Sequence, residues 1–498
     1  MNPASRGVLP SKKSNSPVNF KLSILLSAMI AFACFIPKAE AGQKTSFQYY
    51  DSLTYQQYLK GQWTNLIQVG NCSLSDGFDF KNLRFRMGVA YYFKKNFRSA
   101  AYHLHKALKF DSYDTQAAFY YNLACEAGGR SGESFHVRGT PKPAHFVDFA
   151  YADVGQIFAP NVKDSVNLTD SVFYKELIQP ISRTLTSFGL GLRPLSNLSV
   201  FLGVSNIDLV DRKSSGFMSK SIVRDHVDTL QYENDYYYRL VFMPKVFKTD
   251  FKNKQTSFYA NVSYFPFPGL KITPAFHLLR ITADRIFPYP VYNRYTDTIY
   301  LDKTNNSWHT ALIDSTTDYS FRHSDTTYYD YSMSLSVTEE IGNFTVGING
   351  TYSRMLNQKA YQLGATLDWY PFGNTNLYTH SSFTYRHDTL SSNTIFEQAI
   401  GARIYKKGWL EGSVTFGELN TYNERNAYLV YNQLYPLTKR LGLTFYPYIG
   451  KHLEVMLLYR FQMLGMYLTT SKINEVRPTL TNPQYGCSSL TTGIKWKF

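Results

Sequence analysis

The sequence contains no run of about 18 or more apolar residues, the length that a helix needs to cross a lipid bilayer. Its mean hydropathy is −0.29. Both observations exclude a helical membrane protein. The sequence also contains no G-x-S-x-G, H-E-x-x-H, Walker or C-x-x-C motif. It therefore lacks the usual signatures of a serine hydrolase, a zinc protease, a nucleotide-binding loop or a redox site.

Cysteine is scarce, with four residues in the whole chain. Cys34 lies in an N-terminal targeting segment, which leaves Cys72, Cys125 and Cys487. An odd number of cysteines at wide spacing is neither a disulfide framework nor a zinc motif. A Cys72–Cys125 bridge and two unpaired buried thiols both stay open. We predict no cofactor and no metal ion.

Residues 1–41 have the features of a secretory signal peptide. A basic segment, with its charges at Arg6, Lys12, Lys13 and Lys21, precedes an apolar stretch over residues 22–37. Ala39-Glu40-Ala41 before Gly42 fits the small-x-small cleavage rule. The alternative is a lipoprotein with Cys34 as the lipidated residue, but the Ala31-Phe32-Ala33 that precedes it is a poor match to that pattern.

Negative charge is the minority, because 52 Lys and Arg residues face 37 Asp and Glu residues, for a net charge of +15. A basic surface can meet anionic lipid headgroups or an acidic polymer. Solubility and anchoring at the membrane interface explain it more simply, and we expect no nucleic acid partner. The chain is rich in Tyr (41) and Phe (36), as aromatic girdles at two membrane interfaces require.

From about residue 330 to the C-terminus, apolar and polar residues alternate with the period of two that a strand imposes. The last strand is the clearest case. One face carries Leu490, Thr492, Ile494, Trp496 and Phe498, and the other carries small residues and lysines. A soluble β-sandwich or β-helix could alternate in the same way. However, small or charged second faces on successive strands favour an outer-membrane barrel, with lipid outside and a wet lumen inside.

This pattern predicts an antiparallel transmembrane β-barrel over residues 146–498, with about 14 strands and a range of 12–16. Short turns follow the even-numbered strands, and most other connections are longer: 210–254, 283–325, 419–435 and 465–485. Because short turns face the periplasm, we expect both ends of the mature chain there. Segments 232–243 and 426–434 are strand-like and would give sixteen strands if they joined the wall.

Seven charged residues fall on the predicted lumen face by parity: Asp368, Arg386, Glu397, Arg403, Glu411, Glu454 and Arg460. Their mixed signs suggest ion pairs across strands in a partly filled lumen rather than a selectivity ring of one sign. Ile494, Trp496 and Phe498 form the terminal-strand signal that we expect the barrel-assembly machinery to read. His380 lies on the lumen face near Ser382, but no Ser–His pair can be placed at the lipid-facing wall.

Residues 42–130 are predicted to form a helical domain of tetratricopeptide-like repeats, because similar residues recur 34 positions apart. The residues expected to pack the repeats are Trp63, Gly88, Tyr91, Phe97, Ala100, Leu104 and Ala107. Arg84 and Ser112 depart from the repeat pattern, and a helical bundle without repeats is the alternative. Residues 131–145 are predicted to be a linker. The fold class is therefore α+β in separate domains.

Several short motifs carry a resemblance to a known family: Phe396-Glu397-Gln398, Trp409-Leu410-Glu411-Gly412, Phe416-Gly417, Tyr422-Asn423-Glu424, Tyr431-Asn432 and Lys495-Trp496-Lys497-Phe498. With them the chain resembles uncharacterised tetratricopeptide-repeat outer-membrane β-barrel proteins of Gram-negative bacteria. Its architecture is also similar to that of surface-lipoprotein assembly modulators and exopolysaccharide export porins. The resemblance implies location and architecture, but not a substrate.

These expectations lead to a non-enzymatic protein of the outer membrane, with its N-terminal domain in the periplasm. The repeat domain would recruit a protein or peptide partner, or a cargo, for passage or display at the cell surface. Outer-membrane lipid would surround the barrel. A structural or assembly scaffold with a closed lumen is the first alternative, and an outer-membrane enzyme is the second.

Overall fold

The computed structural model describes residues 46–130, 146–158, 172–230, 233–302, 307–389, 391–405, 408–419, 421–431, 437–450, 452–465, 467–472, 479–481 and 484–498. The predicted signal peptide and linker lie outside these ranges. The chain divides into a first unit that ends at Ser52 and a second unit, Leu53–Phe498. The second unit holds helices α3–α6 and the whole β-sheet.

Among the described residues, five helices come first: α2 Phe47–Leu59, α3 Trp63–Ser75, α4 Lys81–Phe93, α5 Phe97–Phe110 and α6 Thr115–Ala127. Helices α2, α4 and α6 begin 34 residues apart, and so do α3 and α5. The turn residues Gly61, Lys95 and Gly129 share this spacing, and all three have a positive φ. In the part of the chain that the structure describes, no helix is both long and apolar enough to cross a membrane.

The predicted packing residues lie where helices meet. Ala100, Leu104 and Ala107 of α5 are fully buried. A Cβ built on Gly88 of α4 would lie 2.9 Å from Leu104 Cδ2 and closer still to Leu104 Cγ. Only glycine therefore permits this approach of α4 to α5.

The three aromatic packing residues are half-buried at the edges of the same contacts. Trp63 stacks on Phe93, with ring centroids 4.9 Å apart, and Tyr91 stacks on His103 at 5.2 Å. Phe97 packs against Tyr92 at 5.6 Å. These rings fill the grooves that small residues leave between helices.

Arg84 departs from the repeat pattern, yet it is buried in the helical module (α3–α6, with the part of α2 from Leu53 onward). Its guanidinium donates to both carboxylate oxygens of Asp79, at 2.7 and 2.8 Å, and to Nδ1 of His103 at 3.1 Å. Burial and the charge of Arg84 lower the pKa of His103 to about 3. The imidazole is therefore neutral at pH 7 and can accept this hydrogen bond.

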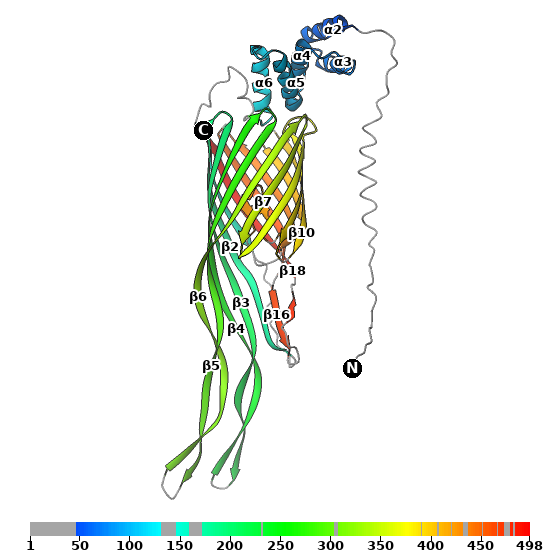
Figure 1. Ribbon diagram of the computed structural model, residues 1–498. Helices are drawn as coiled ribbons and strands as arrows, with labels where there is room; N and C mark the ends of the chain where they lie inside the picture. The colour runs from blue at the N-terminus through cyan, green and yellow to red at the C-terminus, as the bar shows by residue number, and fades with distance from the viewer. Residues whose placement is uncertain are drawn as a thin grey trace, which may run out of the picture. The chain divides into compact units, whose positions relative to one another are not determined.

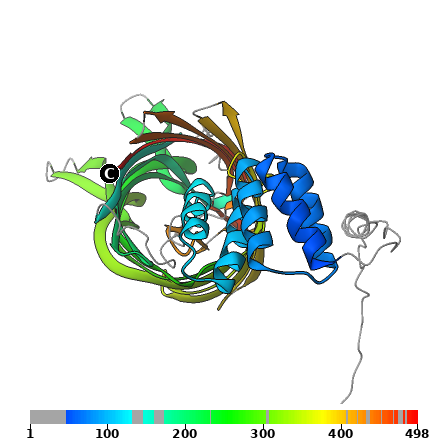
Figure 2. The same ribbon diagram turned by 90° about the horizontal axis from the view of Figure 1, so that it is seen from above.

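The rest of the described chain forms one antiparallel barrel, as predicted (Figures 1 and 2). Its fourteen strands are β1 Val147–Phe158, β2 Val172–Leu195, β3 Leu198–Leu230, β4 Glu233–Phe267, β5 Leu270–Asp302, β6 Ser307–Ile341, β7 Phe344–Met355, β8 Gln358–Trp369, β9 Leu377–Asp388, β10 Ser392–Tyr405, β11 Gly408–Phe416, β14 Leu437–Ile449, β15 Leu453–Gly465 and β18 Gln484–Lys497. Strand β1 closes the ring, because it pairs with β18 on one side and β2 on the other.

In the barrel wall, large apolar side chains face outward and polar side chains face inward, which is the reverse of a soluble protein. On β8, Tyr361 and Leu363 are 56% and 67% exposed on the outer face, whereas Gln362 between them is only 5% exposed. Ile494 and Trp496 on β18, and Phe498 directly after it, are likewise exposed. Large apolar side chains outside and polar ones inside are the arrangement that lipid and a wet lumen select.

At one end of the barrel all connections are short: between β2 and β3, β4 and β5, β6 and β7, β8 and β9, β10 and β11, and β14 and β15. The other end of the described barrel has short turns only between β7 and β8 and between β9 and β10 among the connections that leave the wall directly. At the other end, β3–β4 and β5–β6 continue as long two-stranded ribbons (Figure 1). The prediction of loops at 210–254 and 283–325 was therefore wrong. Beyond the wall, both faces of a ribbon meet the same medium. Its residues therefore need not alternate between apolar and polar, and that alternation is the pattern from which a strand is predicted.

The sixteen-strand alternative is also wrong. Segment 233–243 belongs to β4 and pairs with the end of β3. Residues 429–430 form β13, which pairs only with β12 (Asn423–Glu424) and stays out of the wall. The last long connection holds β16 (Tyr467–Lys472), which pairs with the far half of β2, and β17 (Thr479–Thr481).

The close approach of α4 and α5 gives a first prediction. Alanine normally stabilises a helix relative to glycine by roughly 0.5–1 kcal/mol. Gly88→Ala should instead destabilise the helical module, because overpacking typically costs about 1–3 kcal/mol. Circular dichroism of the full chain at 222 nm during a urea titration measures this. A module stabilised by the substitution would contradict the observed packing.

The sorting of the wall gives a second prediction. Leu457 of β15 faces outward, and Leu458 lines a lumen cavity. Leu457→Arg should cost about 2–4 kcal/mol near the bilayer midplane, and Leu458→Arg should be milder. Heat-modifiable gel mobility of membranes that carry each variant compares the two. Equal damage would mean that the strand register differs by one residue.

Candidate functional site

The predicted lumen charges all belong to inward-facing positions, but they fall into separate groups. Asp368, Glu397 and Glu411 line one cavity of about 360 Å³. Arg460 lines a neighbouring cavity of about 150 Å³. Arg386 is fully buried beside Asp388. Near the short turns, Glu454 pairs with Lys497, and Arg403 lies over the Trp409 ring at 5.1 Å.

Of the partners of these charges, the sequence pointed to His380 but not to Arg440. Arg440 lies 3.6 Å from Glu397, and His380 lies 2.5 Å from Asp368. Tyr378 donates a hydrogen bond to Glu411. The signal was present, because Arg440 on β14 has the inward parity, between the outward-facing Lys439 and Leu441 positions of its strand.

A segment between β11 and β14 folds into the barrel (Figure 2). We call its described residues 417–419 and 421–431 the lumen loop, and it includes β12 and β13. Thr421, Arg425, Asn426 and Ala427 have positive φ angles between 50° and 61°. Left-handed backbone at four non-glycine residues is costly and persists only where surrounding contacts fix the chain.

One set of contacts ties the lumen loop to β7 and β8. The backbone N–H of Asn423 donates to Gln362 Oε1 at 3.0 Å, and its side-chain amide donates to the same oxygen at 2.6 Å. The side-chain amide also donates to Ser353 Oγ at 3.2 Å. Gln362 in turn donates to the Asn423 carbonyl at 3.3 Å. All three side chains are buried, so these bonds are shielded from water.

Other contacts reach the wall on the far side. His277 Nδ1 of β5 lies 2.7 Å from the Ala427 carbonyl, and Tyr259 of β4 donates to the Asn426 carbonyl at 3.3 Å. Tyr428 bonds to Tyr151 of β1. The lumen loop therefore crosses the lumen and is held on opposing walls.

The lumen loop also carries charge. Glu424 is buried and accepts from Arg440 at 2.6 Å, and Tyr431 donates to the same carboxylate at 2.9 Å. Arg440 further donates to Thr415 at 2.9 Å. A buried guanidinium and carboxylate in one hydrogen-bonded network are costly to separate, because either group alone would keep an unpaired buried charge.

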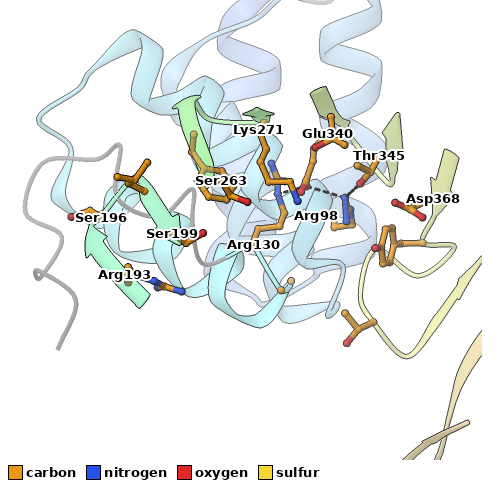
Figure 3. A pocket seen from close by; sticks show the side chains of 18 residues that line it. Arg98, Arg130, Arg193, Ser196, Ser199, Ser263, Lys271, Glu340, Thr345 and Asp368 are labelled. Carbon is orange, nitrogen blue, oxygen red and sulfur yellow. Dashed lines mark hydrogen bonds and ion pairs between the residues drawn. The ribbon is translucent and has the colours of Figure 1, made fainter. Parts of the chain in front are cut away.

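The helical module is docked on the barrel at the short-turn end. Arg98 of α5 donates to Glu340 at 2.8 Å and to Thr345 at 2.5 Å, and its guanidinium lies 3.9 Å from the centre of the Tyr370 ring. Arg130 pairs with the same Glu340. Figure 3 shows both arginines converging on this carboxylate. Side-chain exposures of 3% for Arg98 and 9% for Arg130 keep the ion pairs away from water.

Hydrogen bonds of backbone groups and uncharged side chains complete the contact between the helical module and the barrel, which we call the joint. The Arg98 N–H donates to the Gly373 carbonyl at 3.0 Å. Asn374 donates to the Lys95 carbonyl at 2.9 Å, and Ser99 donates to Asn343 at 3.3 Å. The joint thus engages the turns after β6 and β8, and sequence patterns gave no signal for it.

A cavity of about 430 Å³ lies at this joint, between the end of α6 and the inner wall (Figure 3). We call it the mouth cavity. Its charged lining consists of Arg98, Arg130, Arg193, Lys271, Glu340 and Asp368. Lys271, Thr338, Asp368 and Tyr370 also line the 360 Å³ lumen cavity, so the two cavities adjoin.

Two groups suggested by sequence do not form reactive sites. His380 is bound to Asp368, but no hydrogen bond joins it to Ser382, although all three residues are described. Cys72 and Cys125 are both free thiols; Cys125 is buried as expected for an unpaired thiol, but Cys72 is exposed. Within the described ranges, no group of three or more His, Cys, Asp and Glu residues is placed to hold a metal ion.

No protein-family model matches the chain, and no curated protein matches its sequence. A Pseudomonas aeruginosa FadL homologue is 9% identical, covers 71% of this chain and 90% of its own, and has a TM-score of 0.41. For the P. putida toluene transporter TodX the values are 8%, 72%, 91% and 0.39. For a bacterial polysaccharide outer membrane secretin they are 8%, 71%, 99% and 0.33.

These similar structures are outer-membrane β-barrel proteins. Because their TM-scores lie below 0.5, the similarity says nothing about what this chain does. The barrel is established by its own strand pairing. The finer resemblance to tetratricopeptide-repeat barrels, assembly modulators and export porins stays a prediction.

The joint gives a third prediction. Arg98→Gln leaves Glu340 with one fewer cation and should weaken docking by up to about 3–5 kcal/mol. Ser99→Cys and Asn343→Cys, in a Cys72→Ser background, place two thiols across the joint for a short bismaleimide crosslinker. Arg98→Gln should lower the crosslinked fraction strongly. Lys109→Gln, which removes an exposed charge at the other end of α5, should leave it unchanged; equal yields in both variants would refute the proposed role of Arg98.

Proposed function

We propose that this chain passes or displays a hydrophilic solute across the outer membrane, and that its helical module recruits a protein or peptide partner in the periplasm. The observation that supports this proposal most directly is the joint between the helical module and the barrel. It holds the module at the short-turn mouth of the barrel, directly next to two adjoining polar cavities. Short turns face the periplasm in barrels of this type, which supports a periplasmic module.

The helical spacing supports a tetratricopeptide-like module. The 34-residue interval between helix starts is the interval of that repeat. Aromatic rings connect alternate helices: Tyr58 of α2 to Phe85 of α4 at 6.2 Å, and Phe85 to Tyr120 of α6 at 6.2 Å. Next to them, Phe119 is 59% exposed. Such a row offers an apolar peptide segment a large rigid contact area.

The outer face supports insertion in the outer membrane. Ile494, Trp496 and Phe498 are exposed on one side of the final strand, where the barrel-assembly machinery and then lipid would contact them. We propose a non-enzymatic role, because the lumen groups that could react are engaged in fixed pairs such as His380–Asp368 and Tyr378–Glu411.

A closed-lumen scaffold is the second candidate, and the lumen loop favours it. Bonds from Asn423 to β8 and from Tyr428 to β1 hold the loop across the lumen. If the loop stays in place during function, the barrel would anchor the helical module without conducting. Whether removal of the loop opens a path therefore separates the two candidates.

Planar-bilayer conductance gives the fourth prediction. The purified full chain should show small unitary conductance, because the lumen loop narrows the lumen. Replacing residues 421–431 with an equally long Gly-Ser segment should raise the conductance several-fold, because the wall contacts of the loop are lost. Asn426→Gly, which keeps the backbone carbonyl that Tyr259 binds and tolerates the positive φ of this position, is the control and should behave like the unmodified chain.

The outcome decides between the candidates. Conductance in the unmodified chain that rises in the loop replacement supports passage. Absence of current from both proteins, with heat-modifiable mobility showing that both barrels are folded, would overturn passage in favour of the scaffold.

A further inference from the structure

The mouth cavity has an unbalanced charge. Four cationic side chains line it against two carboxylates. Arg98 and Arg130 both pair with Glu340. Arg193 pairs with Asp148 at 2.9 Å. The second carboxylate of the lining, Asp368, is bound to His380.

Lys271 is the cationic side chain of the lining that belongs to none of these pairs. It makes no hydrogen bond or ion pair with any residue in the described part of the chain, and it lies at the boundary shared by the mouth cavity and the lumen cavity. In Figure 3 its side chain extends toward Arg98 and Glu340, on the side where the arginines converge. Positive charge gathered in a partly enclosed space is unfavourable unless an anion or water compensates it.

Neutral donors surround the same space. Hydroxyl groups line the cavity from several strands and turns: Ser196, Ser199, Ser263, Thr338, Thr345 and Thr375. Hydroxyl donors beside an ammonium and guanidinium groups form the environment in which phosphate and carboxylate oxygens are bound by charge-assisted hydrogen bonds. A volume of about 430 Å³ is within the range of small-molecule sites.

We propose that the mouth cavity binds the anionic oxygens, phosphate or carboxylate, of a hydrophilic solute, and that Lys271 contacts them directly. This deepens the proposed function by naming the class of solute, and its role in transport rests on that function. The site itself rests on the charge surplus. Lys271 places the bound anion where the mouth cavity opens into the lumen.

Isothermal titration of the full chain in detergent at pH 7 and low salt tests the site, with pyrophosphate and citrate as separate probes. At least one of the two should bind saturably. Lys271→Gln should weaken that binding about tenfold or more, as expected for loss of a hydrogen bond to a charged group. Lys271→Arg keeps the charge and should retain binding.

Lys359→Gln is the matched control, because Lys359 is exposed at the other end of β8, away from the mouth cavity. It should leave the affinity unchanged. Binding of neither probe at millimolar concentration, or equal affinities in Lys271→Gln and Lys359→Gln, would overturn the proposal. Heat-modifiable mobility confirms that each variant is folded.

The result is separable from the conductance test. A chain that conducts but binds neither anion would lose only this inference. A chain that binds an anion through Lys271 but conducts in no form would keep the site and lose the passage function.

Discussion

The pairing of β1 with both β18 and β2 is the interaction on which the rest of the structure depends. Lipid offers no hydrogen bonds, so every backbone N–H and C=O in the wall must find a partner within the sheet. Only a closed sheet meets this demand along its whole circumference. Once the ring is closed, the period of two decides which side chains meet lipid. Trp496 and Phe498 then face outward, while Lys495 and Lys497 face the interior.

Closure of the barrel also leaves inward-facing charges that need partners, and the lumen loop supplies some of these partners. Charges that face inward lose part of their hydration, and a barrel wall alone supplies partners only at neighbouring strand positions. Arg440 shows the consequence. It lies near Glu397 on the wall, but its shortest ion pair is to Glu424, which the lumen loop brings in from outside the wall. Loop and wall therefore stabilise each other through charge.

What could be predicted from sequence follows from the range of the interactions involved. The fourteen strands and the inward parity of Asp368 or Glu397 depend on neighbours within a few residues and on the contrast between lipid and water. The ribbons of β3–β4 and β5–β6 were missed because that contrast is absent beyond the wall. The lumen loop depends on Asn423 meeting Gln362, and the joint on Arg98 meeting Glu340, 242 residues apart. A local sequence pattern contains no information about such long-range contacts.

The joint and the mouth cavity share their arginines. Arg98 and Arg130 fix the helical module to Glu340, and the same guanidinium groups line the space next to Lys271. A ligand that drew on their charge would change the strength of docking. By thermodynamic reciprocity, a partner that shifted the module would change the affinity for that ligand by the same factor. If the module and the cavity each bind a ligand as proposed, Glu340 would couple the two sites directly, because Arg98 and Arg130 pair with it and also line the cavity.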